Sequence, residues 1–380
     1  MDLREFQKLG QSIWLDYLRR DLIESGALAR LVRDDDVRGI TTNPDIFNKA
    51  ISESADYDGE LARDVRTRDE SPEALYERIV VDDIQKSADV LRPVFDASDG
   101  RDGFVSMEVS PHLAHDTEAT LEEARRLWTK VRRDNVMIKV PGTVEGFPAV
   151  EQLTSEGINV NITLLFGRRA CTRVHEAYMS GLEKRIARGQ PIDRLASVAS
   201  MFVSRIDVLV EEVLRERLAS ATGSTRAELQ SLIGTVGIAN AKLGYDDWKR
   251  TIKSPRWKAL AARGARPQRM LWASTSTKSK ELSDVHYVEA LIGPDTIDTI
   301  PPKTLDAVRD HGVGVARLEE GLDAARSVMD TLARAGISIE ELADRLVEEG
   351  LTKFATSFDA VIRSVGRKRD QVLARATATA

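Results

Sequence analysis

The stretch that decides the fold is NVMIKVP at residues 135–141, an apolar run interrupted by one charged side chain, Lys139. Two related runs flank it along the chain, GFVSMEV at 103–109 and NVNITLLF at 159–166. All three are short and rich in Val, Ile or other strand-forming residues, which is typical of β-strands that are covered on both faces. Stretches with a 3.6-residue helical period separate them, so the sequence predicts parallel strands joined by helices.

The same alternation continues toward both ends of the chain. The remaining candidate strands are 12–17 (SIWLDY), 39–43 (GITTN), 196–203 (ASVASMFV), 269–274 (RMLWAS) and 296–300 (TIDTI). Eight strands with interleaved helices predict an α/β fold of the (β/α)8 TIM-barrel class with additional helices. The competing doubly wound sheet requires a glycine-rich phosphate turn, and the sequence contains neither GxGxxG nor GxxxxGK[ST].

The 380 residues suit a single (β/α)8-barrel domain spanning residues 1–380. Because the candidate strands are unevenly spaced, we expect helical additions around 45–95, 222–268 and 322–369. Within the last of these, Gly336 and Gly350 are expected to break the helices.

The composition excludes several classes of protein. A hydrophobic content of 42% with 31% charged residues is typical of a globular protein. The 55 basic and 61 acidic residues give a net charge of −6, which argues against a nucleic-acid partner. The sequence lacks a long apolar stretch and a signal-peptide pattern, so we expect no membrane partner and a cytoplasmic location. The single cysteine, Cys171, excludes a disulfide framework and fits a reducing cytoplasm.

Polar side chains stand at or near the C-terminal ends of the candidate strands, where barrels of this class carry catalytic residues. These residues, from six strands, are Asp16, Asn43, Glu108, Lys139, Asn161, Thr163, Ser200 and Arg205. Asn161 and Thr163 alternate along one strand and therefore point to the same face. So many polar groups on separate strands are hard to explain by packing alone.

Lys139 is the most informative of them, because lysine is among the residues least often fully buried. Burial disfavours the ammonium form and favours the neutral amine, which can attack a ketone and form a Schiff base. Alternatively, Lys139 is a structural lysine that reaches to water or pairs with Glu108.

Asp16 and Glu108 supply carboxylates from two other strands. An aldol cleavage needs a base for the hydroxyl proton and an acid/base group for forming and dehydrating the carbinolamine. Two carboxylates in different surroundings can divide these tasks. Alternatively, each carboxylate only pairs with Lys139 or Arg205.

Together these segments closely resemble the transaldolases, which are class I aldolases of the pentose phosphate pathway. The resemblance extends roughly over residues 11–302. It is most specific in GITTNPDIF (39–47), VMIKV (136–140) and EQLTSEGINVNITLLF (151–166), and LWASTSTK (271–278) resembles the longer bacterial branch.

The resemblance implies a role for each matching residue. Lys139 would form the Schiff base, and Asp16 would take the proton from the C4 hydroxyl. Glu108 would act through a water molecule that Thr163 helps to hold. The other implied contacts are Asn43 and Asn161 with substrate hydroxyls, Ser200 and Phe202 in the pocket wall, and Arg205 with the substrate phosphate.

The chain departs from the family pattern after the seventh strand. Many transaldolases place a second phosphate-binding arginine there, whereas residues 273–278 read ASTSTK. Ser274, Ser276 and Lys278 are the candidates to bind phosphate instead, with lysine acting as a point charge.

We expect neither a metal nor an organic cofactor. His112 and His115 lie three residues apart with Asp116 beside them, but no third metal ligand is evident in the sequence nearby. In Schiff-base chemistry the imine itself is the electron sink.

The resemblance implies a transferase of carbohydrate metabolism that acts on sugar phosphates, as a monomer or homodimer. It would move a dihydroxyacetone unit from sedoheptulose 7-phosphate to glyceraldehyde 3-phosphate, giving erythrose 4-phosphate and fructose 6-phosphate. The main alternative is a fructose-6-phosphate aldolase, which uses the same lysine but releases free dihydroxyacetone. A remote alternative is a non-catalytic barrel that serves as a binding protein, which the lysine and the two carboxylates disfavour.

Overall fold

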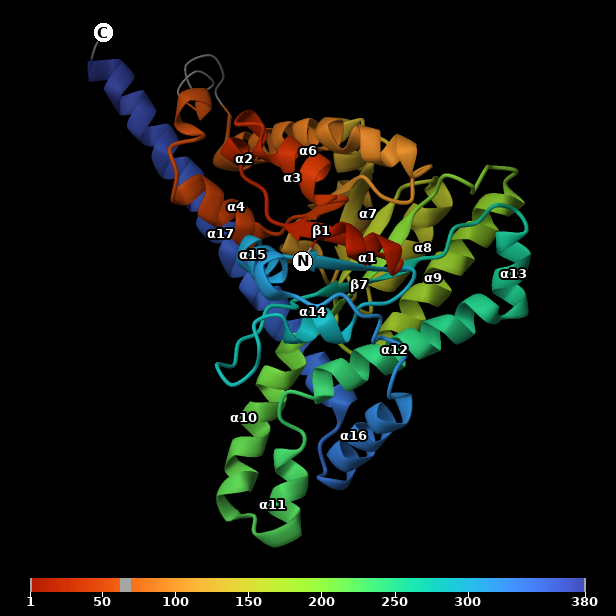
Figure 1. Cartoon of the computed structure of the whole chain (residues 1–380). Coiled ribbons are helices and arrows are strands. Elements are labelled where there is room, and N and C mark those ends of the chain that lie inside the picture. Colours follow the sequence, from red (N-terminus) through yellow and green to blue (C-terminus); the bar gives the residue numbers. More distant parts are fainter. Residues whose placement is uncertain (1, 62–69, 379–380) are drawn as a thin grey trace.

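The computed structural model describes residues 2–61 and 70–378, and in these residues eight parallel strands close into a barrel in chain order (Figure 1). The strands are β1 (Gln11–Asp16), β2 (Gly39–Thr41), β3 (Phe104–Glu108), β4 (Val136–Pro141), β5 (Val160–Leu165), β6 (Ser197–Phe202), β7 (Arg269–Ala273) and β8 (Thr296–Ile300). The predicted (β/α)8 barrel is confirmed, and each strand lies within two residues of its expected bounds.

One helix precedes β1, and helices follow every strand. Up to β6 they are α1 (Arg4–Lys8), α2 (Arg20–Glu24), α3 (Ala27–Asp35), α4 (Pro44–Ser52), α6 (Pro72–Ala97), the 3-10 helix η1 (Pro111–Leu113), α7 (Thr117–Val131), α8 (Gly146–Glu156) and α9 (Arg168–Ala187). After β6 they are α10 (Ser204–Ser220), α11 (Gly223–Gln230), α12 (Val236–Lys253), α13 (Pro255–Ala261), α14 (His286–Ala290), α15 (Pro302–His311), α16 (Leu322–Arg334) and α17 (Ile339–Ala378).

The segment GITTNP illustrates how local sequence sets a strand end. β2 stops at Thr41, and Asn43 caps the following helix α4, since its side chain accepts a hydrogen bond from the N–H of Ile46 at 3.1 Å. Pro44 occupies the first helical position, where its missing N–H is not needed. This capping places Asn43 at the C-terminal mouth of the barrel.

Apolar side chains from different strands fill the barrel interior. Trp14, Met137 and Leu271, from β1, β4 and β7, belong to one buried cluster. Gly39 on β2 faces the Trp14 ring so closely that a Cβ atom there would lie 2.4 Å from a ring carbon. Glycine is therefore required at the start of β2 for the indole to fill the barrel.

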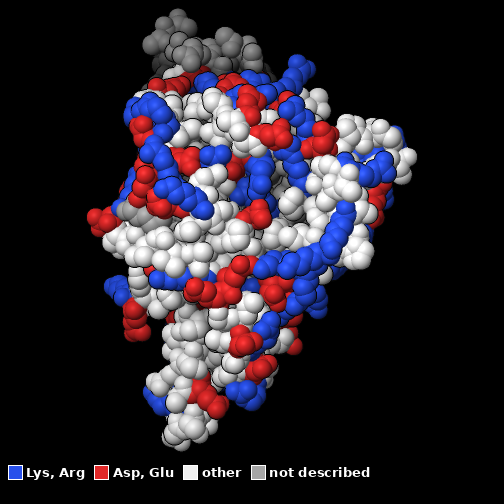
Figure 2. Space-filling model, turned by 45° about the vertical axis from the view of Figure 1, so that its right-hand side comes forward, with Lys and Arg blue, Asp and Glu red and all other residues white. Residues whose placement is uncertain are grey.

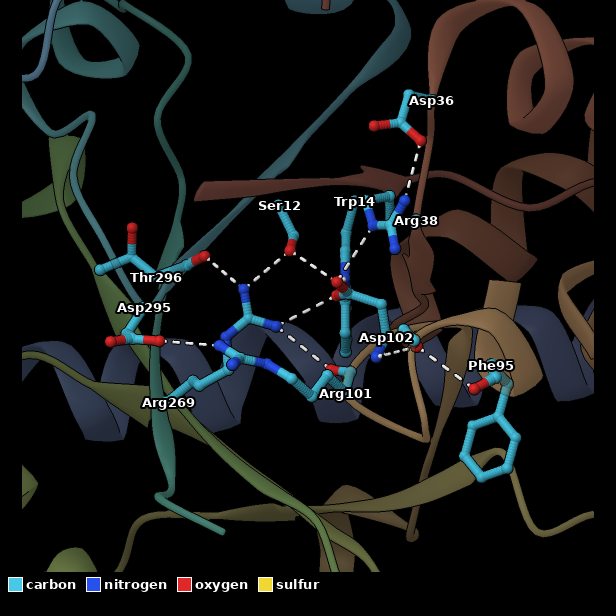
Figure 3. Close-up of polar contacts among 11 residues, drawn as sticks. Ser12, Trp14, Asp36, Arg38, Phe95, Arg101, Asp102, Arg269, Asp295 and Thr296 are labelled. Carbon is cyan, nitrogen blue, oxygen red and sulfur yellow. Dashed lines mark hydrogen bonds and ion pairs between the residues drawn. The ribbon is translucent and has the colours of Figure 1, made fainter. Parts of the chain in front are cut away.

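A buried carboxylate, Asp102, closes the N-terminal end of the barrel (Figure 3). It accepts hydrogen bonds from Ser12 at 2.8 Å and from the Trp14 indole at 3.1 Å. Arg38 and Arg269 each form an ion pair with it at 3.1 Å. These contacts join β1, the entry to β2, the entry to β3 and the first residue of β7.

The electrostatic balance at Asp102 favours the ionised form. Burial by itself would raise the pKa of this carboxyl, but the charges of Arg269 and Arg38 and the hydrogen bonds from Ser12 and Trp14 outweigh it. The net result is a lowered pKa, so Asp102 is charged at neutral pH.

The C-terminal helix α17 differs from the prediction. Gly336 does separate α16 from α17, but the break expected at Gly350 is wrong, since α17 continues through it. A Cβ atom at Gly350 would lie 2.8 Å from Leu164 Cδ2, so glycine lets the helix lie directly on β5. The intrinsic helix penalty of glycine is only about 1 kcal/mol, which such packing overcomes.

Helices occupy the described parts of each stretch in which additions were expected, and residues 62–69 of the first stretch lie outside the described residues. Figure 1 shows α10 and α11 projecting together from the lower side of the molecule, with α16 nearby. From this side α17 runs to the upper side of the view and packs against α4 and α6 on its way. Strand β5 and helix α10 also contact α17, which therefore joins parts of the chain that are far apart in sequence.

Charged residues of both signs are mixed over the face seen in Figure 2, without a continuous basic surface. Within the described residues, no helix combines the length and the apolar character that a membrane crossing requires.

We predict that Asp102→Asn destabilises the fold by roughly 3–5 kcal/mol, because it leaves two arginines without their buried partner. Since the pKa of Asp102 is lowered in the fold, its ionised form contributes stability above its unfolded pKa, and this contribution is lost only at more acidic pH. Thermal unfolding should therefore show a large loss of Tm at pH 7 that narrows below about pH 4.

The control is Asp295→Asn, which removes the exposed ion pair between Asp295 and Arg101 seen in Figure 3. Exposed pairs contribute about 0–1 kcal/mol, so this variant should unfold close to the native protein. Equal losses in the two variants would contradict a special role for Asp102.

Candidate active site

A pocket of about 460 Å³ opens at the C-terminal ends of the strands. The predicted residues that line it are Asp16, Asn43, Lys139, Thr163, Ser200, Phe202, Arg205, Ser274, Ser276 and Lys278. Glu108 and Asn161 do not line this pocket but lie next to Lys139 on the adjacent strands. The structure therefore brings together all the side chains that the sequence analysis selected.

Lys139 occupies the floor of the pocket. The barrel register places it between Glu108 on β3 and Asn161 on β5. Its side chain is only 6% exposed, and Nζ donates a hydrogen bond to the Thr42 carbonyl at 3.0 Å. The Glu108 carboxylate lies 3.5 Å from Nζ and is the acidic partner of this amine among the described residues.

Asn161 is held inside the barrel rather than at the pocket surface. Its amide nitrogen donates to the Ser106 hydroxyl at 2.9 Å, and its carbonyl oxygen accepts from the Ser200 hydroxyl at 2.6 Å. This chain of hydrogen bonds spans β3, β5 and β6 beside Lys139 and fixes the orientation of Asn161.

Asp16 lies on another wall of the pocket. One of its carboxylate oxygens accepts a hydrogen bond from the Thr41 hydroxyl at 2.7 Å, and Thr41 in turn contacts the Thr299 hydroxyl at 2.6 Å. Burial raises the pKa of Asp16, against the opposing charge of Lys139 and the hydrogen bond from Thr41. A carboxylate of raised pKa accepts a proton more readily, as a catalytic base requires.

The pKa of Glu108 is markedly raised. Burial raises its pKa from an ordinary value of 4.5 to about 7, although the charge and hydrogen bond of Lys139 act in the opposite direction. Among the described residues, the Glu108 oxygens have no hydrogen-bond partner apart from the contact with Lys139, and the buried hydroxyl of Thr163 has none. Buried polar groups in this state are commonly satisfied by water.

Strand β5 is irregular where it carries Thr163. Its register with β6 shifts between Ile162 and Leu165, and Leu164 has a positive φ of 58°. Bulges of this kind redirect side chains next to functional sites. Ser274, directly after β7, also has a positive φ, of 56°, and accepts a hydrogen bond from the N–H of Ser204 at 3.0 Å.

Cationic side chains gather at the rim of the pocket. Arg205 in the first turn of α10, Lys278 after β7 and Lys353 on α17 all line it. In the described chain, none of the three has a hydrogen bond or ion pair with another residue. Partial burial, together with the charge of Arg205, lowers the pKa of Lys278 and of Lys353. Three cations without partners attract an anion strongly.

Sequence reasoning missed the contribution of α17 to this site. Lys353 and Phe354 both line the pocket, and the Phe354 ring centroid lies 5.8 Å from Lys139 Nζ. No local signal identifies them, because an amphipathic helix pattern does not show which face of the barrel the helix covers.

The other residues considered in the sequence have ordinary surroundings. His112 contacts Asp359 at 2.8 Å, and His115 lies near Glu145 and Glu348. Within the described residues, no group of three or more His, Cys, Asp and Glu side chains is placed to hold a metal ion. Cys171 is buried on α9, where burial raises the pKa of its thiol to about 12 and leaves it unreactive.

A buried lysine between a carboxylate and an amide, with a second carboxylate on the same pocket, defines a barrel of the Schiff-base aldolase class. The comparisons with known proteins agree. The sequence matches the transaldolase/fructose-6-phosphate aldolase family over residues 13–365, and the chain belongs to this family.

Its relatives include several proteins named transaldolase. The one from Trichodesmium erythraeum is 46% identical over 96% of this chain and 97% of its own length. The one from Thiobacillus denitrificans is 46% identical over 96% of this chain and 99% of its own, and that from Acidothermus cellulolyticus is 46% identical over 97% and 98%.

We predict that the Tm of Glu108→Gln rises relative to that of the native protein as the pH increases from 5 to 8. The raised pKa means that the folded protein holds a proton which the unfolded chain releases near pH 4.5, so native stability falls as the pH rises toward about 7. Glutamine has no such titration. Thermal unfolding at several pH values should show a Tm difference between the variant and the native protein that changes with pH in this direction. A difference that is constant with pH would contradict the shifted titration.

Proposed function

We propose that this chain is a transaldolase that transfers a dihydroxyacetone unit between sugar phosphates through an imine on Lys139. The observation that carries the proposal is the arrangement of Lys139. It is a buried amine at the floor of a pocket, 3.5 Å from a carboxylate and below a rim of unpaired cations. The names of the relatives support the same reaction. The expected substrates are sedoheptulose 7-phosphate and glyceraldehyde 3-phosphate, giving erythrose 4-phosphate and fructose 6-phosphate in the pentose phosphate pathway.

Imine formation is assigned to Lys139, Glu108 and Thr163. The neutral amine of Lys139 adds to the donor ketone and gives a carbinolamine. Glu108, whose pKa of about 7 lets it both give and take a proton, supplies a proton to the departing hydroxyl, so that water and the iminium form. The unpartnered Thr163 hydroxyl and Glu108 oxygens support a water site between them.

Carbon–carbon cleavage is assigned to Asp16. It takes the proton from the C4 hydroxyl, the C3–C4 bond breaks, and the electron pair moves into the iminium to give an enamine on Lys139. The aldose leaves and an acceptor aldose enters to reverse the sequence. Asn43 at the mouth and Asn161 beside Lys139 are proposed to bind the hydroxyls of the retained three-carbon unit.

The substrate phosphate is proposed to bind at Arg205, Lys278 and Lys353. Ser274 and Ser276 line the same pocket and add hydroxyl donors, while Ser200 and Phe202 form its wall. Lys353 and Lys278 then take the place of the second arginine that the sequence lacks. Arg205 presents a planar fork for two phosphate oxygens, whereas the lysines act as point charges.

The second candidate within the family is a fructose-6-phosphate aldolase. It requires the same lysine and carboxylates, so the site geometry fits both reactions. The names of the relatives, at 46% identity over nearly their full lengths, favour transfer.

We further propose that the chain folds as one domain with helical additions, since α17 packs against α4, α6, α10 and β5. A cytoplasmic location is proposed from the single buried cysteine and from the metabolic reaction. A monomer or a homodimer is proposed, and analytical ultracentrifugation distinguishes them.

We predict that borohydride traps a reduced three-carbon adduct on Lys139 when fructose 6-phosphate is supplied. Lys139→Ala should lose both the adduct and turnover while the protein remains folded, as measured by circular dichroism. If the enzyme is a transferase, sustained turnover of fructose 6-phosphate should also depend on added erythrose 4-phosphate. Product analysis measures this dependence. An adduct on a different lysine would refute the assignment, and steady release of dihydroxyacetone without an acceptor would favour the aldolase.

We predict that Arg205→Ala raises KM for fructose 6-phosphate roughly ten- to a hundredfold, because a charge-assisted contact contributes about 1.5–3 kcal/mol. Lys353→Met should raise it less, and both variants should react with unphosphorylated fructose as the native enzyme does. Lys258→Met, an exposed lysine on α13, is the matched control. An equal loss with fructose and fructose 6-phosphate would mean that the substituted residue is structural.

A further inference from the structure

Glu108 lines a second cavity rather than the pocket that opens at the mouth of the barrel. This side cavity has a volume of about 170 Å³ and lies between β3 and helices α4, α6, α7 and α17. Asn43 lines both spaces, so the side cavity adjoins the wall of the pocket. The cavity belongs to no step of the mechanism assigned so far.

Polar groups are distributed along the side cavity. Its lining includes Asn43, Tyr76, Glu108, Ser110 and Glu123, set among the apolar side chains Phe47, Val80, Met107, Val109, Leu127 and Phe358. Both Glu108 oxygens are buried, and their partner within the described part of the chain is Lys139, at 3.5 Å. A water molecule needs roughly 10–15 Å³ of such volume and two to four polar partners, so the cavity has room for several.

Exposure increases along the cavity from Glu108 outward. The Glu108 side chain is 5% exposed, Glu123 is 19% exposed, and Arg126 at the outer end is 50% exposed. Glu123 accepts a hydrogen bond from the N–H of Ser110 at 3.3 Å, which ties it to the loop that directly follows Glu108. The side cavity therefore leads from the catalytic carboxylate to the surface.

Aromatic side chains pack against one another in the wall of the cavity. The Tyr76 ring makes edge-to-face contacts with Phe47 of α4 and Phe358 of α17, at centroid distances of 6.3 and 5.6 Å. Burial, with added effects of the Glu108 and Glu123 charges, raises the pKa of Tyr76, so its hydroxyl stays protonated beside the two carboxylates. A neutral hydroxyl can both donate and accept hydrogen bonds in a water chain.

The proposed reaction requires water and protons on the Glu108 side while the substrate fills the mouth. When the carbinolamine loses its hydroxyl, one proton leaves Glu108 and one water is released as the iminium forms. Hydrolysis of the iminium consumes one water and returns the proton to Glu108. A sugar phosphate that reaches from Lys139 to the cations of the rim blocks the direct route to solvent through the pocket.

We propose that the side cavity is a separate water and proton route to Glu108, with Glu123 and Tyr76 as positioning residues that order its water. This inference rests on the proposed imine chemistry and adds the route by which that chemistry exchanges water with solvent.

The experiment measures oxygen exchange at the C2 carbonyl of fructose 6-phosphate in ¹⁸O-water, in an Asp16→Ala background. That variant is expected to form and hydrolyse the imine without breaking the C3–C4 bond. Each cycle then replaces the C2 oxygen with one from solvent, which mass spectrometry detects. Exchange in Lys139→Ala gives the uncatalysed background.

Two variants test the route in this background. Val80→Phe fills the cavity, and Glu123→Gln removes a charged group that orders its water. We expect each variant to slow exchange about five- to tenfold. General acid–base catalysis contributes roughly 10²–10⁴-fold to a rate, and these variants keep Glu108 and impair only the supply of water and protons to it. The apparent Kd of fructose 6-phosphate should stay unchanged, and Glu123→Asp should restore part of the rate.

The matched control is Val347→Phe, which fills a different cavity, between α9 and α17, and is expected to exchange at the unmodified rate. The proposal is overturned if the Glu123→Gln and Val80→Phe variants both exchange at the unmodified rate. If Val80→Phe does not fold, an unmodified rate in Glu123→Gln alone overturns it. Equal slowing in Val347→Phe also overturns it. If Asp16→Ala shows no exchange above the Lys139→Ala background, the proposed imine chemistry is wrong. That result differs from one in which Asp16→Ala exchanges oxygen but the cavity variants exchange it at the same rate.

Discussion

The buried carboxylate of Asp102 is the interaction on which the rest of the barrel depends. By pairing with Arg38 and Arg269 and accepting from Ser12 and Trp14, it joins strands that are far apart in sequence at the base of the barrel. A parallel barrel has one register once it is closed, so fixing the base also fixes which residues are neighbours at the mouth. In that register Glu108 on β3 lies beside Lys139 on β4.

The two ends of the barrel use buried charge in opposite ways. At the base, every oxygen of Asp102 is hydrogen-bonded or ion-paired, and its pKa is lowered. At the mouth, burial raises the pKa of Glu108 and of Asp16, and Glu108 and Thr163 retain unsatisfied oxygens. Unsatisfied buried groups reduce stability, and a barrel whose base is fully paired can tolerate them where chemistry requires them.

Helix α17 completes the site from the end of the chain. Lys353 and Phe354 lie over the mouth, and one turn further along, Phe358 forms a wall of the side cavity. Residues spaced by three or four positions share one helix face, so a single helix borders both spaces. The same helix packs on α4, whose N-cap is the site residue Asn43.

The sequence by itself determined the strands, the barrel class and the selection of Lys139, Asp16, Glu108 and Thr163. Strand patterning is local, and polar residues inside apolar runs stand out without knowledge of the fold. Tertiary structure alone decided that Gly350 continues a helix, that Asn161 is hydrogen-bonded inside the barrel, that Lys353 joins the cationic rim and that Glu108 faces a second cavity. These features arise from contacts between segments far apart in the chain, where packing outweighs local propensity and leaves no local pattern to read.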